Sequence, residues 1–307
     1  MTSKNGIIGL VIGDAMGVPL EFQIRERLMQ NPTTEMLGYG SHNVPKGTWS
    51  DDSSMTIATI DSIIDKKEIN TNDIADKFLE WIKNAKYTAT DKVFDIGRTT
   101  LQALSRYESN IKKAEDAGGK GEMDNGNGSL MRILPLAYYC FSRKMSDEEI
   151  LNAVKIVSSI THGHEISVMG CYIYVLFAIE LLKGKNLKKA YKKICNSNYS
   201  SFSYSCICKY DRILDKDIKK YKLEEISSQG YVVSTLEATL WVLFNTNSYR
   251  QAIIGAINLG NDTDTIGACV GGLAGIIYGY DEQWKNEIIK IDYIEKLCDQ
   301  FDKILEN

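Results

Sequence analysis

NDTDTIGACVGGLAG, at residues 261–275, joins a cluster of acidic and hydroxyl side chains to an apolar helical segment. Gly267, Gly271 and Gly275 recur every four residues in that segment and therefore lie on one face of a helix. A glycine in a helix interior costs roughly 1 kcal/mol of helix stability relative to alanine. Three glycines on one face therefore indicate a compensating need, namely that another backbone comes very close to that face. We expect this close approach to hold the acidic cluster against a second one earlier in the chain.

The second acidic cluster is Ser50-Asp51-Asp52-Ser53, which also borders apolar helical sequence. Neighbouring carboxylates repel each other, and charged side chains are seldom buried unless they are paired or bind a metal. Carboxylate and hydroxyl oxygens are the ligands preferred by hard ions such as Mg²⁺, Mn²⁺ or Ca²⁺. The alternative is that Asp52 and Asp264 only cap their helices while their neighbours stay solvated. Two clusters of the same kind favour the metal site.

Helical periodicity dominates the remaining sequence, and convincing alternating strands are absent. Ser146-Asp-Glu-Glu149 is a capping box that begins a helix, and Asn72 is expected to cap a helix over 72–83. Apolar side chains at helical spacing predict further helices at 52–65, 165–183, 231–244, 248–259, 265–279 and 282–305, the last divided into two. The predicted fold class is all-α. A chain of 307 residues can form one large core or two fused lobes.

Composition excludes several classes of protein. The chain is 44% hydrophobic and 25% charged with a formal net charge of -4, so it lacks the basic surplus of proteins that bind nucleic acid. Seven scattered cysteines without a CxxC pair are typical of free thiols in a reducing compartment, which indicates the cytoplasm. Two apolar segments, 168–182 and 266–280, are about fifteen residues long, too short to span a membrane. We expect both to be buried core helices.

Three long non-helical stretches, 31–50, 114–130 and 196–210, are candidate functional loops. The second of them runs into NGNGSLMR, residues 125–132, whose backbone amides are suited to binding an anion. The pattern matches neither a Walker loop nor a dinucleotide fingerprint. Arg132 is either a phosphate ligand or a salt-bridge residue. His162 is either a ligand-facing side chain or a structural one.

Two isolated acids are further candidates. Glu21 follows Pro19, which ends or kinks a helix, and is either a third carboxylate ligand or a surface residue. Asp95 stands among apolar residues, where burial and nearby charge tune the pKa of a carboxylate. It is either a general base or a helix cap. A Gly-x-Ser-x-Gly elbow and a Cys/His nucleophile pair are both absent, so covalent catalysis is not indicated.

Five motifs follow one another along the chain: GLVIGDAMGVPLEF (9–22), GTWSDDS (47–53), NGNGSLMR (125–132), ITHGHE (160–165) and NLGNDTDTIGACVGGLAG (258–275). Together they resemble the ADP-ribosylglycohydrolase family. The resemblance implies a single domain over residues 1–307, a compact multi-helix bundle whose central cleft binds two Mg²⁺ or Mn²⁺ ions. It also implies a hydrolase that removes ADP-ribose from modified side chains of a protein substrate, most often from arginine.

Matched motif by motif, the resemblance assigns roles to individual residues. The metal ligands would be Ser50, Asp51, Asp52, Asp262, Asp264 and Thr265. Ser50 stands where threonine is common in the family, and its hydroxyl keeps an oxygen ligand. Glu21 would contact the metals or close the cleft, and Asp95 would be the catalytic base. The substrate would be held by Asn125, Gly126, Asn127, Gly128, Ser129 and His162.

Three alternative functions stay open. In the first, the enzyme performs the same chemistry on another acceptor, such as ADP-ribosyl-serine, a nucleobase or a free ADP-ribose conjugate. Alternatively, the protein binds ADP-ribose without cleaving it, although the full set of oxygen ligands favours an enzyme. A different dinuclear hydrolase, such as a phosphatase, is disfavoured because the chain has only three histidines. We expect a monomer with ADP-ribose as its product and without stable binding to nucleic acid or membranes.

Overall fold

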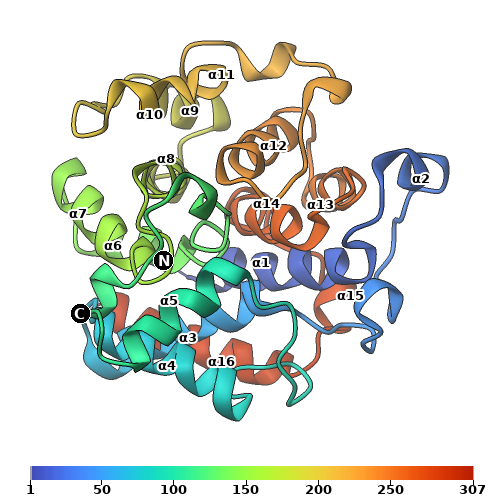
Figure 1. Cartoon of the computed structure of the whole chain (residues 1–307). Helices are drawn as coiled ribbons and strands as arrows, with labels where there is room; N and C mark the ends of the chain where they lie inside the picture. Colours follow the sequence, from blue (N-terminus) through green and yellow to red (C-terminus); the bar gives the residue numbers. More distant parts are fainter. Residues whose placement is uncertain (1, 307) are drawn as a thin grey trace.

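The computed structural model describes residues 2–306, in which helices are joined by loops and no sheet is formed (Figure 1). The α-helices are α1 (Lys4–Gly17), α2 (Arg25–Gln30), α3 (Asp51–Lys66), α4 (Thr71–Asn84), α5 (Arg98–Glu108), α6 (Leu134–Ser142), α7 (Asp147–Ser158), α8 (Glu165–Leu182), α9 (Leu187–Cys195), α10 (Tyr204–Cys208), α11 (Asp211–Leu214), α12 (Val232–Phe244), α13 (Tyr249–Ile257), α14 (Thr263–Tyr278), α15 (Glu282–Lys285) and α16 (Ile291–Glu306). Short 3₁₀ turns are η1 (Val18–Leu20), η2 (Gly40–His42), η3 (Ala114–Asp116), η4 (Glu122–Asp124), η5 (Ile218–Lys220) and η6 (Leu223–Glu225). The all-α prediction is confirmed.

Most predicted spans correspond to a helix of the structure. The capping box of Ser146 begins α7, and residues 282–305 are divided into α15 and α16 as expected. The prediction of Asn72 as a cap is wrong, because Asn70 Oδ1 accepts the Asp73 N–H at 3.0 Å and α4 begins earlier. All seven cysteines are free thiols, as their spacing indicated.

Helices α1 and α14 meet through their backbones near the centre of the molecule (Figure 1). A β-carbon added at Gly13 would lie 1.9 Å from the carbonyl oxygen of Gly267. One added at Gly271 would lie 2.2 Å from that of Gly9. The glycine stripe of α14 therefore packs on α1, not on α3, which carries the other acidic cluster. This close approach requires glycine on both helices, since any side chain would separate them.

Gly13→Ala is expected to destabilise the protein by about 3 kcal/mol, because the new methyl group collides with the backbone of α14 and no side chain can move aside. Gly255→Ala in α13 is the matched control. Its β-carbon would lie 3.5 Å from the nearest atom, on Val242, and the helix should gain about 0.5–1 kcal/mol. Urea unfolding measures both variants, and equal midpoints would contradict the prediction.

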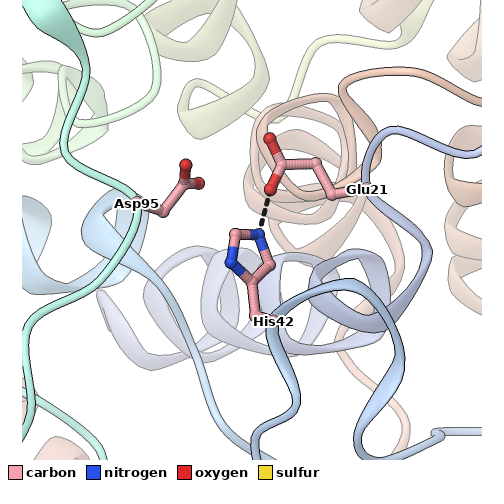
Figure 2. A group of neighbouring side chains, drawn as sticks. All are labelled: Glu21, His42 and Asp95. Atoms are coloured by element: carbon pink, nitrogen blue, oxygen red, sulfur yellow. Dashed lines mark hydrogen bonds and ion pairs between the residues drawn. The ribbon is translucent and has the colours of Figure 1, made fainter.

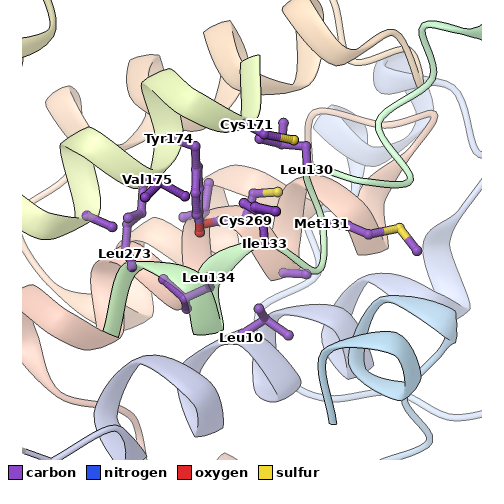
Figure 3. Packing of buried hydrophobic residues seen from close by; sticks show 14 of the residues in the cluster. Leu10, Leu130, Met131, Ile133, Leu134, Cys171, Tyr174, Val175, Cys269 and Leu273 are labelled. Carbon is purple, nitrogen blue, oxygen red and sulfur yellow. The ribbon is translucent and has the colours of Figure 1, made fainter. Parts of the chain in front are cut away.

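The hydrophobic core runs through α1, α6, α8 and α14. Figure 3 shows Leu10, Leu134, Tyr174 and Leu273 packed together, and the Tyr174 hydroxyl donates to the Cys269 carbonyl at 2.9 Å. Among residues 2–306, α8 is the one helix long and apolar enough to cross a membrane, and 89% of its length is buried inside the protein. α14 is likewise buried along most of its length. Both apolar segments are therefore core helices, as predicted.

Candidate functional site

Three helices bring buried carboxylates together. Asp52 lies in the first turn of α3, Asp264 lies in the first turn of α14, and Asp14 lies near the end of α1. One oxygen atom from each lies within 4.8 Å of the other two. Glu21, Asp262 and Asp264 form a second group with the same spacing. Asp264 belongs to both groups, so the arrangement suits two cations that share one carboxylate.

Within residues 2–306, His42 is the one ion-pair partner of these carboxylates, and it pairs with Glu21. Burial, followed by the charge of neighbouring carboxylates, raises the pKa of Asp51, Asp52 and Asp264 well above the usual range. Asp52 Oδ1 and Asp264 Oδ2 are buried and have no hydrogen-bond partner within residues 2–306. A buried carboxylate oxygen without a partner is unfavourable. Hard divalent cations would satisfy both oxygens, so these residues fit Mg²⁺ or Mn²⁺.

Hydroxyl groups connect the two acidic clusters. Ser50 Oγ lies 3.0 Å from Asp52 Oδ2 and accepts the Asp52 N–H at 3.3 Å, and Thr265 Oγ1 donates to Asp52 Oδ2 at 3.5 Å. The expected contact between the clusters is therefore present. Neither Asp52 nor Asp264 caps its helix: Ser50 caps α3, while Asp262 holds the cap position of α14 without making a side-chain capping bond.

Asp14 is a buried acid that no predicted role anticipated. Both of its oxygens accept the Ser50 N–H at 3.0 Å, and Oδ2 also accepts the Ser53 N–H at 3.0 Å and the Ser53 hydroxyl at 2.5 Å. Burial raises its pKa to about 6, although these hydrogen bonds lower it. Through these hydrogen bonds Asp14 anchors the start of α3 and so positions Asp51 and Asp52, in addition to its place in the first carboxylate group. An acid inside an apolar, glycine-rich helix was the signal for it.

A cavity of about 310 Å³ opens beside the carboxylates. Among the predicted site residues, its lining includes Glu21, Asp51, Asp95, Gly126, Asn127, Gly128, His162, Asp262 and Thr265. Ser50, Asp52 and Asp264 lie beneath that wall. No sequence pattern singled out Arg98, which begins α5, or Gly230, although both also line the cavity.

The glycine-rich loop packs directly on a histidine. A β-carbon at Gly128 would lie 2.8 Å from His162 Cε1, and one at Gly126 would lie 3.6 Å from its Nε2. The absence of side chains at Gly126 and Gly128 therefore leaves room for the imidazole of His162, which lines the cavity beside them. Asn127 Nδ2 donates to Asp262 Oδ2 at 2.7 Å. Asn127 thus orients a carboxylate of the acidic centre, in addition to lining the cavity.

Two residues expected to bind the substrate lie behind the cavity wall. Ser129 is fully buried, and its hydroxyl accepts a hydrogen bond from Ser158 at 3.0 Å. Asn125 Nδ2 donates to the Glu122 carbonyl at 3.1 Å, and Asn125 Oδ1 accepts the Ser167 hydroxyl at 3.0 Å. These side chains stabilise the loop and do not face the cavity, which corrects the expectation for both. The NGNGSLMR motif identified the loop, but it did not indicate which of its side chains face the cavity.

Arg132 is fully buried under the loop. Within residues 2–306 it forms no ion pair and does not reach the cavity, so both sequence alternatives for it are wrong. Its Nη2 donates to Thr161 Oγ1 at 2.8 Å, and this oxygen lies 2.9 Å from His162 Nδ1. The Thr161 hydroxyl therefore links the buried guanidinium to the imidazole. The other ring nitrogen of His162, Nε2, lies beside Gly126 and Gly128.

Burial, followed by the charge of Arg132, lowers the pKa of His162 to about 3. The imidazole is therefore neutral at physiological pH and has one donor and one acceptor nitrogen. Since His162 lines the cavity, it is suited to hydrogen-bond a polar ligand there.

Glu21 and Asp95 line the cavity, and the side chain of His42 lies close to both of them (Figure 2). One atom from each of the three lies within 4.8 Å of the others, and His42 Nε2 is hydrogen-bonded to Glu21 Oε2. Burial raises the pKa of Glu21 to about 7 despite the bond from His42, and the charges of Asp95 and Asp262 add to the rise. Glu21 can therefore exchange a proton near neutral pH. Nothing local in the sequence connects His42 with Glu21.

The chain is similar in sequence to proteins of one known family. A sequence profile of the ADP-ribosylglycohydrolase family matches residues 3–307. The chain is 30% identical to the ADP-ribosylarginine hydrolase Tri1 of Serratia proteamaculans, over 97% of this chain and 78% of that protein. It is also 30% identical to the protein of the same name from Pseudomonas putida, over 98% and 78% of the two chains. The ADP-ribosyl-(dinitrogen reductase) glycohydrolase of Rhodospirillum rubrum is 27% identical, over 93% and 88%.

A solved structure described as an ADP-ribosylglycohydrolase-related protein complex superposes with a TM-score of 0.82 at 25% identity. The match covers 99% of this chain and 98% of that one, so the two share the whole arrangement of helices. The match to the family extends over nearly every residue, including both acidic clusters and the glycine-rich loop. The chain therefore belongs to the ADP-ribosylglycohydrolase family and is an enzyme of that class.

Proposed function

We propose that this enzyme hydrolyses the N-glycosidic bond between ADP-ribose and an arginine side chain of a protein, and that it requires two Mg²⁺ or Mn²⁺ ions. The observation that carries the metal requirement is the pair of buried, unpartnered oxygens, Asp52 Oδ1 and Asp264 Oδ2. Two relatives named ADP-ribosylarginine hydrolase support arginine as the acceptor.

The ions would be held by oxygen atoms of Asp52, Asp262 and Asp264, with Glu21 as a further carboxylate. Ser50, Asp51 and Thr265, in the same two clusters, would supply the other oxygen ligands. When bound, such ions lower the pKa of a water molecule and polarise the ribose hydroxyls. The protein keeps these ligands in place through Asp14, which anchors α3, and through Asn127, which bonds to Asp262.

The remaining residues act on the substrate and on the transferred proton. The backbone N–H groups of Gly126 and Gly128 bind the diphosphate or distal ribose, together with the Nε2–H of His162, whose Nδ1 accepts the Thr161 hydroxyl. Asp95 accepts the proton of the attacking water. The C–N bond breaks through an oxocarbenium-like state, and the guanidinium leaves as neutral guanidine. The water oxygen joins the anomeric carbon, and the proton held by Asp95 passes to the guanidine.

Release of ADP-ribose from an ADP-ribosyl-arginine protein tests the proposal directly. We expect release with Mg²⁺ or Mn²⁺ and none with EDTA. Release in EDTA would overturn the metal requirement. If ADP-ribose binds but no release occurs, the arginine assignment is wrong, and ADP-ribosyl-serine is the next substrate to assay.

We further propose that the enzyme acts in the cytoplasm as a monomer. The seven free cysteines support a reducing compartment.

Thr161→Val is expected to weaken inhibition by the product ADP-ribose about five- to tenfold, because His162 loses the hydroxyl that sets its tautomer. The effect should be constant between pH 6 and 8, since the pKa of His162 is about 3. Thr59→Val is the control: its equally buried hydroxyl donates only to the Met55 carbonyl, at 2.8 Å, within α3. Equal weakening in both variants would contradict the role of Thr161.

A further inference from the structure

Phe22 is a bulky residue in an unusual backbone conformation, directly after Glu21. Its φ is 64°, in the left-handed region, and the residue is 68% exposed. Two backbone hydrogen bonds hold the segment: Phe22 N–H donates to Asn261 O at 2.7 Å, and Asn261 N–H donates to Gln23 O at 2.8 Å. Asn261, in the acidic cluster that leads into α14, therefore holds Phe22 in this conformation. As a result, an aromatic ring is presented to solvent beside the metal ligands.

Phe22 is the first of three rings in a row. Its ring centroid lies 5.8 Å from that of His42, which in turn lies 5.0 Å from that of Phe94. Phe94 is half-buried and directly precedes Asp95. Glu21 holds the middle ring through the hydrogen bond to His42 (Figure 2). We call Phe22, His42 and Phe94 the aromatic row.

The aromatic row borders an excess of negative charge. Glu21 and Asp95 both line the cavity, and the Asp95 carboxylate makes no hydrogen bond to another residue within 2–306. Arg98, a basic side chain on the same wall, donates through Nη2 to the Met123 carbonyl at 3.2 Å, which directs its charge toward that side of the cavity. Met123 precedes the glycine-rich loop. The wall thus divides into an end suited to a cation and an end suited to the diphosphate.

We propose that Phe22 and Phe94, with the charges of Glu21 and Asp95, form the subsite for the guanidinium group of the modified arginine. A guanidinium ion is planar and delocalised, so it stacks on aromatic faces while its N–H groups face carboxylates. A serine acceptor has neither the plane nor the charge. The subsite therefore selects arginine among possible acceptors. The inference rests on the proposed function and names the residues that recognise its substrate.

The test compares two quantities in the metal-loaded enzyme: kcat/KM for an ADP-ribosyl-arginine peptide, and the inhibition constant of free ADP-ribose, which lacks the acceptor. Phe22→Leu removes the aromatic face but keeps an apolar side chain with the same backbone strain. It is expected to lower kcat/KM about five- to thirtyfold and to leave the inhibition constant unchanged. Phe94→Leu should act in the same direction. Phe22→Tyr should recover most of the loss, because it restores an aromatic face.

Tyr204→Leu is the control for loss of an exposed aromatic ring, since Tyr204 is 82% exposed and does not line the cavity. An unchanged kcat/KM in Phe22→Leu would overturn the subsite alone. Equal losses in kcat/KM and in ADP-ribose inhibition would also overturn it, by placing the ring at the ADP-ribose portion. Failure of the wild-type enzyme to cleave the arginine peptide would overturn the proposed function and the subsite together.

Discussion

Asp264→Asn is expected to lower kcat for ADP-ribose release by about 10²- to 10³-fold, the usual effect of removing one electrostatic group from a preorganised site. Asp264 belongs to both groups of closely spaced carboxylates and carries a buried oxygen without a partner. Its loss therefore affects both proposed ion positions. Asparagine has nearly the same shape, so the decrease reports the charge and not a cavity.

The same substitution is expected to stabilise the metal-free protein, by about 2 kcal/mol. Burial, followed by the charges of Glu21, Asp52 and Asp262, raises the pKa of Asp264 well above its usual range. The folded state therefore pays a penalty for this carboxyl when no cation is present. A neutral amide removes the repulsion.

Thermal unfolding in EDTA and with excess Mg²⁺ measures the stability, and a coupled ADP-ribose assay measures kcat. Bound ions should stabilise the wild type by about 3 kcal/mol at one hundred times their Kd. Asp264→Asn should lose most of this gain. Glu237→Gln is the matched control, because Glu237 is buried but paired with Arg212 at 2.7 Å. It should lose stability and keep activity. A variant of Asp264 that is inactive and also less stable in EDTA would contradict the argument.

The stability of the metal-free protein is expected to fall as the pH rises from 6.5 to 8. A carboxyl whose folded pKa exceeds its unfolded pKa binds more protons in the folded state, so stability decreases with pH until the folded pKa is passed. Asp51, Asp52 and Asp264 have such raised pKa values. Each carboxyl that stays protonated through this interval contributes a loss of about 2 kcal/mol. His42 acts in the same direction, because the hydrogen bond to Glu21 raises its pKa above 6.5.

The interval from pH 6.5 to 8 is chosen because His162, whose titration has the opposite effect on stability, contributes little there. Its folded pKa is about 3 and its ordinary value is 6.5, so most of its increase in stability with pH occurs below 6.5. Thermal unfolding at pH 6.5 and 8 should show, in EDTA, a decrease of about 3 °C for each carboxyl that stays protonated, and a much smaller total decrease with saturating Mg²⁺. A midpoint in EDTA that is flat or rises with pH would contradict the prediction. Asp264→Asn should reduce the decrease.

The local structure of this chain was readable from its sequence because helical spacing, capping residues and acidic clusters are short-range features. The helices at 165–183 and 265–279, the capping box at Ser146 and the buried character of both apolar segments all follow from patterns within a few turns. The five ordered motifs also indicated the family, which the comparison over residues 3–307 confirmed.

Side-chain direction was not readable in the same way. The loop motif marked Asn125 to Ser129 as one unit, yet Gly126, Asn127 and Gly128 line the cavity while Asn125 and Ser129 bond behind it. Adjacent residues in a turn point in different directions, and only the packing of the loop on α8 and His162 decides which of them face a ligand.

By itself the sequence determined the helices, the oxygen-rich clusters and the need for a close backbone contact along the glycine stripe. Only the tertiary structure decided that α1 is the partner of that stripe, that Asp14 anchors α3, and that His42 bonds to Glu21. The physical reason is that a spacing along the chain specifies which residues share a helical face. The identity of what that face meets depends on the packing of the whole chain.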